Sequence, residues 1–133
     1  MNGCSELRLL QEAHSRCVAP SRHALRAFCE ALGFGADALD DITTAVGEAL
    51  ANVVEHAYAD DCDQRRSFEL HARFDNGDLA LEVADTGTFR HCVPRPYRGF
   101  GLRIIRAIAQ QMTLDTDGGT RVRMRFTAKT PKS

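Results

Sequence analysis

Apolar residues recur at helical spacing in the middle of the chain, downstream of Asp37. They form one stripe with a period of about 3.6 residues, made of Ile42, Ala45, Val46, Ala49, Leu50, Val53, Val54 and Ala57. This stripe predicts a long amphipathic helix that packs one side on a core. Asp37 is the expected N-cap, because its carboxylate can accept hydrogen bonds from free helical N–H groups.

Two shorter segments show the same spacing. After Pro20 and Ser21, a first helix is predicted from the apolar positions Leu25, Phe28, Cys29 and Leu32. Gly33 and Gly35 are expected to end it. A last helix is predicted from about Leu102 to Met112, with one side made of Leu102, Ile105, Ile108, Ala109 and Met112.

Alternating apolar and polar residues predict strands in the other segments. The clearest pair flanks Asn76-Gly77, which fits a two-residue hairpin turn; its apolar positions are Phe68, Leu70, Ala72 and Phe74 before the turn and Leu79, Leu81 and Val83 after it. Leu7 and Leu9 indicate a possible first strand. After a turn at Asp117-Gly118-Gly119, Val122, Met124 and Phe126 alternate with Arg121, Arg123 and Arg125, which predicts a half-buried strand with a basic outer face.

Helices near the start, middle and end, with an antiparallel hairpin between them, favour an α+β fold. We expect a two-layer α/β sandwich, with the helices on one face of a mainly antiparallel mixed sheet. The length of 133 residues suits a single domain over residues 1–133.

Composition excludes several classes of function. The net charge of −1 and pI near 6.5 provide no basic field for direct nucleic-acid or membrane binding. No segment is apolar enough to span a bilayer, and the N-terminal segment is too polar for a secretory signal, so a cytoplasmic location is expected. The five cysteines are scattered and odd in number, which favours free thiols over disulfides or a zinc site.

Polar residues on the long predicted helix suggest chemistry. Glu48 and Asn52 lie one turn apart and face away from the centre of the apolar stripe. A solvated helix face would explain both, and His56 alone fits a packed histidine. Alternatively, the carboxylate can accept a proton from an attacking hydroxyl, and the amide oxygen can hold a hard cation such as Mg²⁺.

Three glycine-containing stretches could bind a nucleotide. "RGFGL", residues 98–102, precedes a predicted helix, whose N-terminal N–H groups can hold phosphate. It is not a Walker A loop, because no Lys-Ser or Lys-Thr follows these glycines. It is not a dinucleotide fingerprint either, because Ile104 stands where the third glycine is needed. In "VADTG", residues 83–87, Asp85 ends a predicted strand and could accept a hydrogen bond from the amino group of adenine. "GGT", residues 118–120, is the third stretch; each alone also fits an ordinary turn.

Taken in order, these motifs resemble the GHKL superfamily of ATP-binding proteins, and within it the bacterial anti-sigma factor serine/threonine kinases. "EALANVVEHAY" resembles the N box, "DTG" the first glycine box, "GFGL" the second, and "GGT" the final Gly-Thr element. The resemblance runs from about Leu7 to Ala128. It implies a Bergerat-type fold that binds ATP and Mg²⁺.

The resemblance also implies a role for individual residues. Glu48 matches the general base and Asn52 the Mg²⁺ ligand, while Asp85 and Gly87 match the adenine pocket. The phosphate-binding stretch matches Gly99, Phe100, Gly101 and Leu102, and Thr120 matches the threonine near the adenine. His56 and Tyr58 match the pattern with supporting roles.

One position departs from the wider superfamily, because Phe89 replaces the last glycine of DxGxG. The lid, residues 88–98, is also short.

The resemblance implies a homodimeric partner-switching kinase that phosphorylates an anti-anti-sigma partner and holds a sigma factor or similar regulator. A binding module that acts only by sequestration is the alternative. The ATP-binding half of a histidine kinase is disfavoured, because His14 and His23 lie in the wrong context for a phosphoacceptor.

Overall fold

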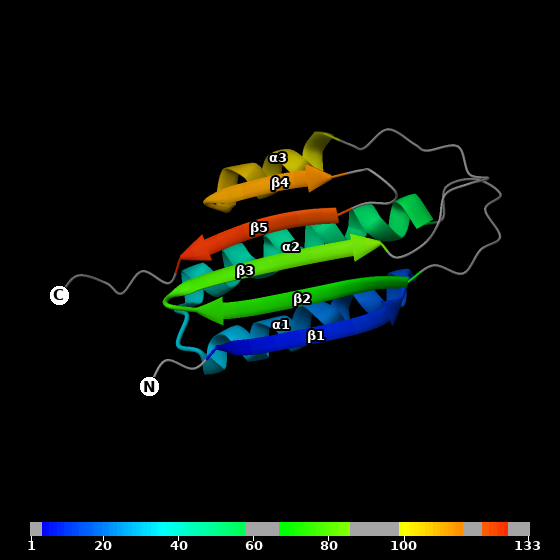
Figure 1. Ribbon diagram of the computed structural model, residues 1–133. Helices are drawn as coiled ribbons and strands as arrows, with labels where there is room; N and C mark the ends of the chain where they lie inside the picture. Colours follow the sequence, from blue (N-terminus) through cyan, green and yellow to red (C-terminus); the bar gives the residue numbers. More distant parts are fainter. Residues whose placement is uncertain (1–3, 58–66, 86–98, 116–120, 128–133) are drawn as a thin grey trace.

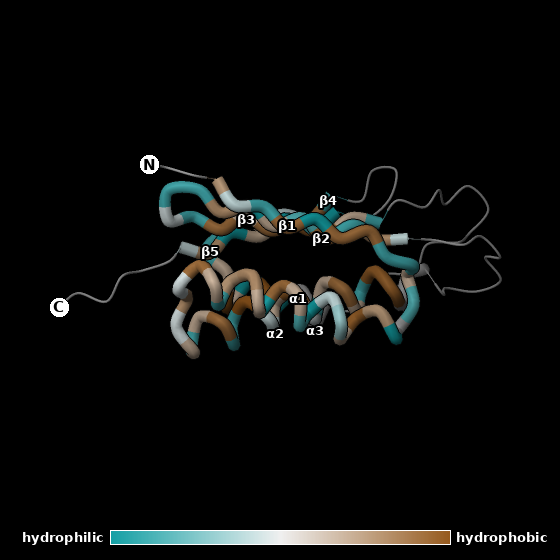
Figure 2. The backbone as a smooth tube through the Cα atoms, turned by 90° about the horizontal axis from the view of Figure 1, so that it is seen from below, coloured by the Kyte–Doolittle hydropathy of each residue, from teal (hydrophilic) through white to brown (hydrophobic). Residues whose placement is uncertain are grey.

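The computed structural model describes residues 4–57, 67–85, 99–115 and 121–127. These residues form two layers, with the α-helices on one face of a sheet and the other face uncovered (Figures 1 and 2). The elements in chain order are β1 (Ser5–Glu12), a 3-10 turn η1 (Ser15–Cys17), α1 (Val18–Ala31), α2 (Ala36–Ala57), β2 (Ser67–Asp75), β3 (Asp78–Asp85), α3 (Gly99–Ile108), β4 (Gln111–Asp115) and β5 (Arg121–Thr127). The predicted α+β sandwich is confirmed.

The sheet has the strand order β1-β2-β3-β5-β4. Each of its neighbouring pairs is antiparallel, so within the described residues the parallel pairing that a mixed sheet requires is absent. The hairpin between β2 and β3 turns at Asn76 and Gly77, whose φ angles are +52° and +81°. Both residues tolerate this left-handed region, as the Asn-Gly signal predicted.

The core lies between the sheet and α2, which is the central helix of the layer. The apolar stripe predicted for α2 is buried from Ile42 to Val54, while the side chain of Ala57 lies outside the described part. Opposite it are the inward residues of the hairpin and β5, namely Phe68, Leu70, Ala72, Leu79, Leu81, Val83, Val122, Met124 and Phe126. Burial of each Val, Leu, Ile, Phe or Met side chain stabilises the folded state by roughly 1.5–3 kcal/mol. No helix among the described residues is long and apolar enough to cross a membrane.

Two helices begin two residues earlier than predicted. Helix α1 begins at Val18, so Pro20 lies inside its first turn, where its missing N–H breaks no helical hydrogen bond. Helix α2 begins at Ala36, and the carbonyl of Gly35 already accepts the N–H of Leu39 at 2.9 Å. Asp37 is therefore in the first turn rather than at the N-cap, where its charge still favours the positive end of the helix.

The end of the chain departs further from the prediction. Helix α3 ends at Ile108, and Met112 belongs to β4 instead. Met112 stands four residues after Ile108, so its position fits the helical spacing even though this part of the chain is an extended edge strand. The inward residues Met112 and Leu114 are only half-buried, and a segment this short has too little alternation to reveal its period.

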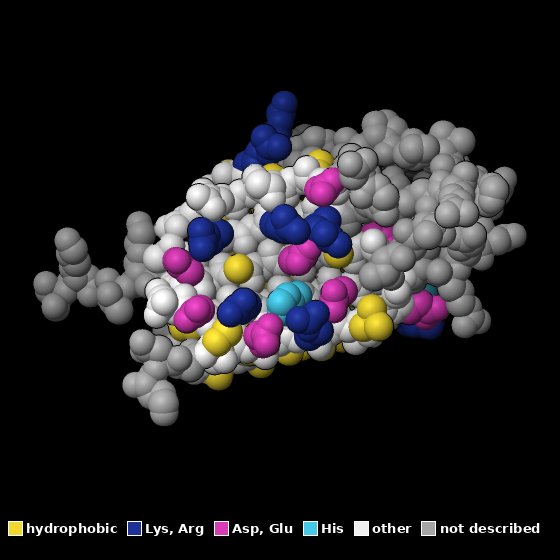
Figure 3. All heavy atoms as spheres, viewed as in Figure 1, with side chains coloured by type: hydrophobic (Ala, Val, Ile, Leu, Met, Phe, Trp, Pro, Cys, Tyr) yellow, Lys and Arg dark blue, Asp and Glu magenta, His cyan; other side chains and the backbone are white. Residues whose placement is uncertain are grey.

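The uncovered sheet face carries side chains of both charges (Figure 3). The arginines of β5 point outward and are exposed, as predicted. Arg121 pairs with Glu82 on β3 at 2.7 Å between Nε and Oε2, and Arg125 approaches Asp78 at 3.8 Å. This sheet face therefore carries a network of exposed ion pairs and is not purely basic. Such surface pairs add little to the stability of the fold.

Gly33 ends α1 with a φ of +98°, which a residue with a Cβ adopts only with strain. Apart from its two chain neighbours, no atom of the described residues lies within 4 Å of the position that a Cβ would occupy there. We therefore expect Gly33→Ala to lower the free energy of unfolding in urea by about 1 kcal/mol through backbone strain alone. Gly33→Asn is the control, because asparagine tolerates this conformation better. Equal stability of Gly33→Ala and wild type would contradict this assignment.

Candidate functional site

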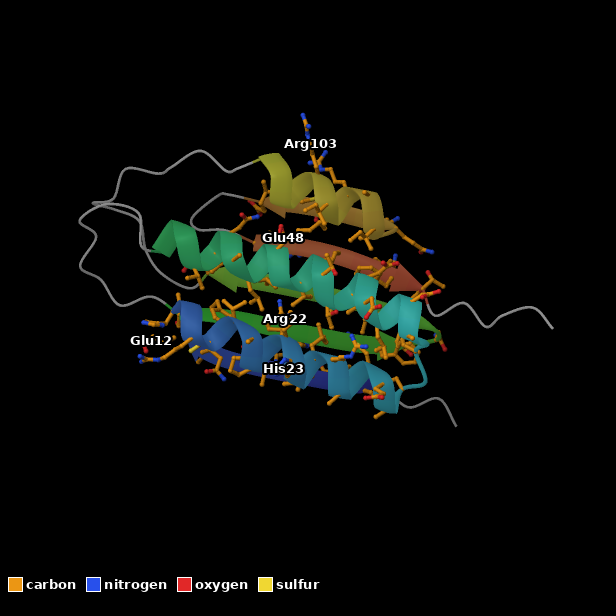
Figure 4. The ribbon with its side chains drawn as sticks, turned by 180° about the vertical axis from the view of Figure 1, so that it is seen from behind. Glu12, Arg22, His23, Glu48 and Arg103 are labelled. Atoms are coloured by element: carbon orange, nitrogen blue, oxygen red, sulfur yellow. The ribbon has the colours of Figure 1, made fainter. Side chains whose placement is uncertain are left out.

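Helix α2 places Glu48 and Asn52 one turn apart, away from the buried stripe. Both side chains are half-buried, and Figure 4 shows Glu48 on the helical layer, on α2 between α1 and α3. The amide nitrogen Nδ2 of Asn52 is buried and has no hydrogen-bond partner within the described part of the chain. Buried amides are nearly always hydrogen-bonded, and leaving one unsatisfied costs about 1–3 kcal/mol. The Nδ2 group of Asn52 can therefore donate a hydrogen bond to an acceptor atom outside the described residues.

Asp85 is the last residue of β3 and is paired across the sheet with Phe68. Its side chain is only 7% exposed, and it is the one buried charged residue among the described positions. Removing a carboxylate from water is unfavourable unless hydrogen-bond donors surround it. A buried carboxylate at the end of a central strand is thus suited to receive N–H donors, such as the exocyclic amine of adenine.

The first turn of α3 consists of Gly99, Phe100, Gly101 and Leu102, so the helix begins at the glycines and three residues earlier than predicted. No acidic residue is present in this first turn. The free N–H groups and the positive end of the helix dipole are directed out of this end, which favours an anion. The predicted phosphate-binding stretch therefore forms the first turn of a helix, and its role in binding phosphate stays a prediction.

These elements converge at one end of the molecule. The carboxyl end of β3, the amino end of α3 and the carboxyl end of α2 all lie on the same side in Figure 1. The β4 strand ends and β5 begins there too. Segments separated along the sequence by tens of residues thus bring a buried carboxylate, a helix N-terminus and the helix of Glu48 and Asn52 to one region.

Several predicted site residues cannot be placed. Gly87, Thr120, Tyr58, Phe89 and the rest of the lid lie outside the described residues. His56 belongs to α2, but its side chain is not described. The described members of the predicted site are therefore Glu48, Asn52, Asp85 and the backbone of residues 99–102.

The residues present fit an Mg²⁺ ion bound with a nucleotide. The Oδ1 atom of Asn52 is an oxygen ligand of the kind that Mg²⁺ takes, and Mg²⁺ completes its shell with water and phosphate oxygens. Among the described residues, no cluster of three or more histidine, cysteine or acidic side chains forms a metal site. A single amide ligand is in keeping with a cation that is bound chiefly by phosphates.

Sequence reasoning missed one feature of this region. Arg22 of α1 lies against Gly47 of α2, and Gly47 is the residue that precedes Glu48. The sequence signal for this contact was Gly47 itself. A glycine inside a long helix lowers helix stability by about 1 kcal/mol relative to alanine, so its presence there needs a structural reason.

Comparison with known proteins agrees with the α+β fold. The family model of the histidine kinase-like ATPase domain matches residues 12–126. The chain is 28% identical to "Serine-protein kinase RsbW" of Listeria innocua serovar 6a, over 90% of this chain and 85% of the relative. The crystal structure of the RsbU and RsbW domains of Rv1364c from Mycobacterium tuberculosis matches the fold with a TM-score of 0.75 and 23% identity.

That structural match covers 96% of this chain but only 33% of the mycobacterial one, so the chain spans about a third of that larger protein. At this identity the match establishes the fold alone. The family match extends over most of the sequence and includes α2, β3 and α3, the elements that form the candidate site. The chain therefore belongs to the histidine kinase-like ATPase domain family.

Proposed function

We propose that the protein is an anti-sigma factor serine/threonine kinase that uses Mg·ATP. Its substrate is a serine or threonine of an anti-anti-sigma partner, and it also holds a sigma factor or similar regulator. The observation that carries the proposal is the pair Glu48 and Asn52 on α2, the helix whose carboxyl end lies on the same side as the end of β3 with buried Asp85 and the start of α3. Similarity to a serine-protein kinase supports the same reaction.

Each residue then has a separate task. Asp85 accepts a hydrogen bond from the amino group of adenine, and the backbone N–H groups in the first turn of α3 donate hydrogen bonds to phosphate oxygens. Asn52 holds Mg²⁺, which neutralises phosphate charge when it is bound. Glu48 accepts the proton of the substrate hydroxyl while the hydroxyl oxygen forms a bond to the γ-phosphorus. The bond between the γ-phosphorus and the bridging oxygen breaks, and ADP leaves.

The test is transfer of labelled γ-phosphate from ATP to anti-anti-sigma proteins encoded in the same genome. The proposal requires that at least one of them is labelled on serine or threonine, that EDTA stops the reaction, and that the kinase itself is not labelled on histidine. Absence of transfer to every such protein, with nucleotide bound, would reject the kinase assignment.

A second candidate is a module that acts only by sequestration. Phe89, in place of the last glycine of the first glycine box, favours it. Such a protein would form a stable complex with the regulator while transferring no phosphate, so complex formation and transfer measured side by side separate the two. We further propose that the protein is cytoplasmic and forms a homodimer; sedimentation of the purified chain would test the homodimer.

A further inference from the structure

The inward face of the sheet changes character at the end of β3. The other inward positions of β2, β3 and β5 are apolar, namely Phe68, Leu70, Ala72, Phe74, Leu79, Leu81, Val83, Val122, Met124 and Phe126. Asp85 continues the alternation of β3 and is buried. Among the inward positions that the structure describes on these three strands, it is the one charged residue.

Phe68 faces this carboxylate across the sheet. It is the first inward residue of β2 and the direct partner of Asp85 in the β2–β3 register. Figure 1 shows the start of β2 and the end of β3 at the same end of the molecule as the start of α3. Cβ atoms at directly opposite positions of antiparallel strands lie about 4.5–5.5 Å apart. Since the side chain of Phe68 is fully buried, its ring places carbon atoms beside the carboxylate on the β2 side.

The next inward residue in this row is polar again. Gln11 of β1 is the register partner of Phe68 and is half-buried. The row therefore runs Gln11, Phe68, Asp85, and two strand spacings separate the outer pair by about 9–10 Å. The amide of glutamine can donate hydrogen bonds to a carboxylate, whereas phenylalanine has no donor. Phe68 thus separates a polar side chain of β1 from Asp85.

The ring also affects how strongly Asp85 can bind a ligand. A hydrogen bond to a carboxylate is stronger where water is excluded, because the local dielectric constant is low. An aromatic side chain fills a large volume with few rotatable bonds. A smaller side chain at position 68 would leave space that water can enter, and would let the carboxylate rotate away from the ligand.

We propose that Phe68 is a positioning residue for base recognition. It holds the carboxylate of Asp85 in place and excludes water from its β2 side, so that the site selects a purine with an exocyclic amine. The inference rests on the proposed role of Asp85 in the adenine pocket. It extends that role, because it assigns part of the selectivity to a residue outside the four sequence motifs.

A pair of nucleotides that differ only in the amine tests this role. The purified chain is titrated by calorimetry with ATP and with purine riboside 5′-triphosphate, whose base carries hydrogen in place of the amino group. For the wild type, loss of the amine should raise Kd by about tenfold or more, the scale of a hydrogen bond to a charged group. In Phe68→Leu this ratio of Kd values should shrink by about twofold or more, the lower end of the coupling between residues in contact.

The ratio is the readout because a general loss of stability would weaken the binding of both nucleotides alike. Phe126→Leu is the matched control, since Phe126 is also buried but pairs with Leu79 at the other end of β3. It should leave the ratio unchanged. Phe68→Met, close to phenylalanine in volume but flexible, should give an intermediate ratio and provides the test if Phe68→Leu does not fold.

The possible failures differ from one another. A folded Phe68→Leu protein with the full wild-type ratio, or an equal fall of the ratio in Phe126→Leu, would overturn the positioning role and leave the proposed function intact. Equal binding of both nucleotides by the wild type would overturn the adenine role of Asp85 together with this inference. Absence of binding of either triphosphate would contradict the proposed kinase itself.

Discussion

Glu48→Ala is expected to lower the rate of phosphate transfer to the partner protein by roughly 10²–10⁴-fold, the usual contribution of a general base. The substrate hydroxyl must lose its proton as it attacks, and alanine provides no acceptor. Glu48 is half-buried on α2 and faces away from the core, so its removal leaves the apolar stripe intact. The loss should therefore appear in kcat and not in the free energy of unfolding.

The Glu48 variant needs a control for nucleotide binding. ATP affinity, measured by calorimetry, should match that of the wild type, because Asp85, Asn52 and the first turn of α3 are unchanged. Glu48→Gln preserves the shape of the side chain and should be nearly as inactive as Glu48→Ala. A Glu48→Ala protein with the full transfer rate would show that another group, or water, takes the proton.

Asp85→Ala is expected to weaken ATP binding by about 1.5–3 kcal/mol, the value of a lost hydrogen bond to a charged group. This corresponds to a roughly 10- to 150-fold higher Kd. The carboxylate is 7% exposed at the end of β3, so little solvent competes for it. Calorimetric titration with ATP would measure the change directly.

Asp85→Asn is the matched variant, since the amide keeps the shape and one acceptor oxygen and should lose less affinity than alanine. Thermal unfolding without nucleotide must accompany both titrations, because a buried position can also affect folding. If Asp85→Ala remained folded and bound ATP as tightly as the wild type, the adenine-pocket assignment would be wrong.

The parts of the fold with long or distinctive patterns could be predicted from sequence. Helix α2 has an apolar stripe over most of its length, and the β2–β3 hairpin has both alternation and an Asn-Gly turn. Strand β4 could not be predicted, because its five residues are too few to show a period. Met112 was assigned to a helix for the same reason.

The site could be predicted only in part. Glu48 and Asn52 share a helix, so their spacing alone placed them together, and Asp85 follows directly from the end of a strand. The convergence of β3, α2 and α3 at one end depends on the strand order, which the sequence pattern leaves open. The contact of Arg22 with Gly47 depends on how α1 packs against α2. Gly47 marks a position of close approach, but the sequence does not identify the residue that approaches it.

The most direct test of the Mg·ATP site is the melting temperature of the purified chain with ATP, in the presence of Mg²⁺ or of EDTA. A ligand that binds only the folded state stabilises it by mass action, by about 2.7 kcal/mol at a concentration of 100 Kd. We predict a clear rise with Mg·ATP, a smaller rise with EDTA, and loss of that difference in Asn52→Ala. No rise at millimolar Mg·ATP would contradict the nucleotide site and, with it, the proposed kinase.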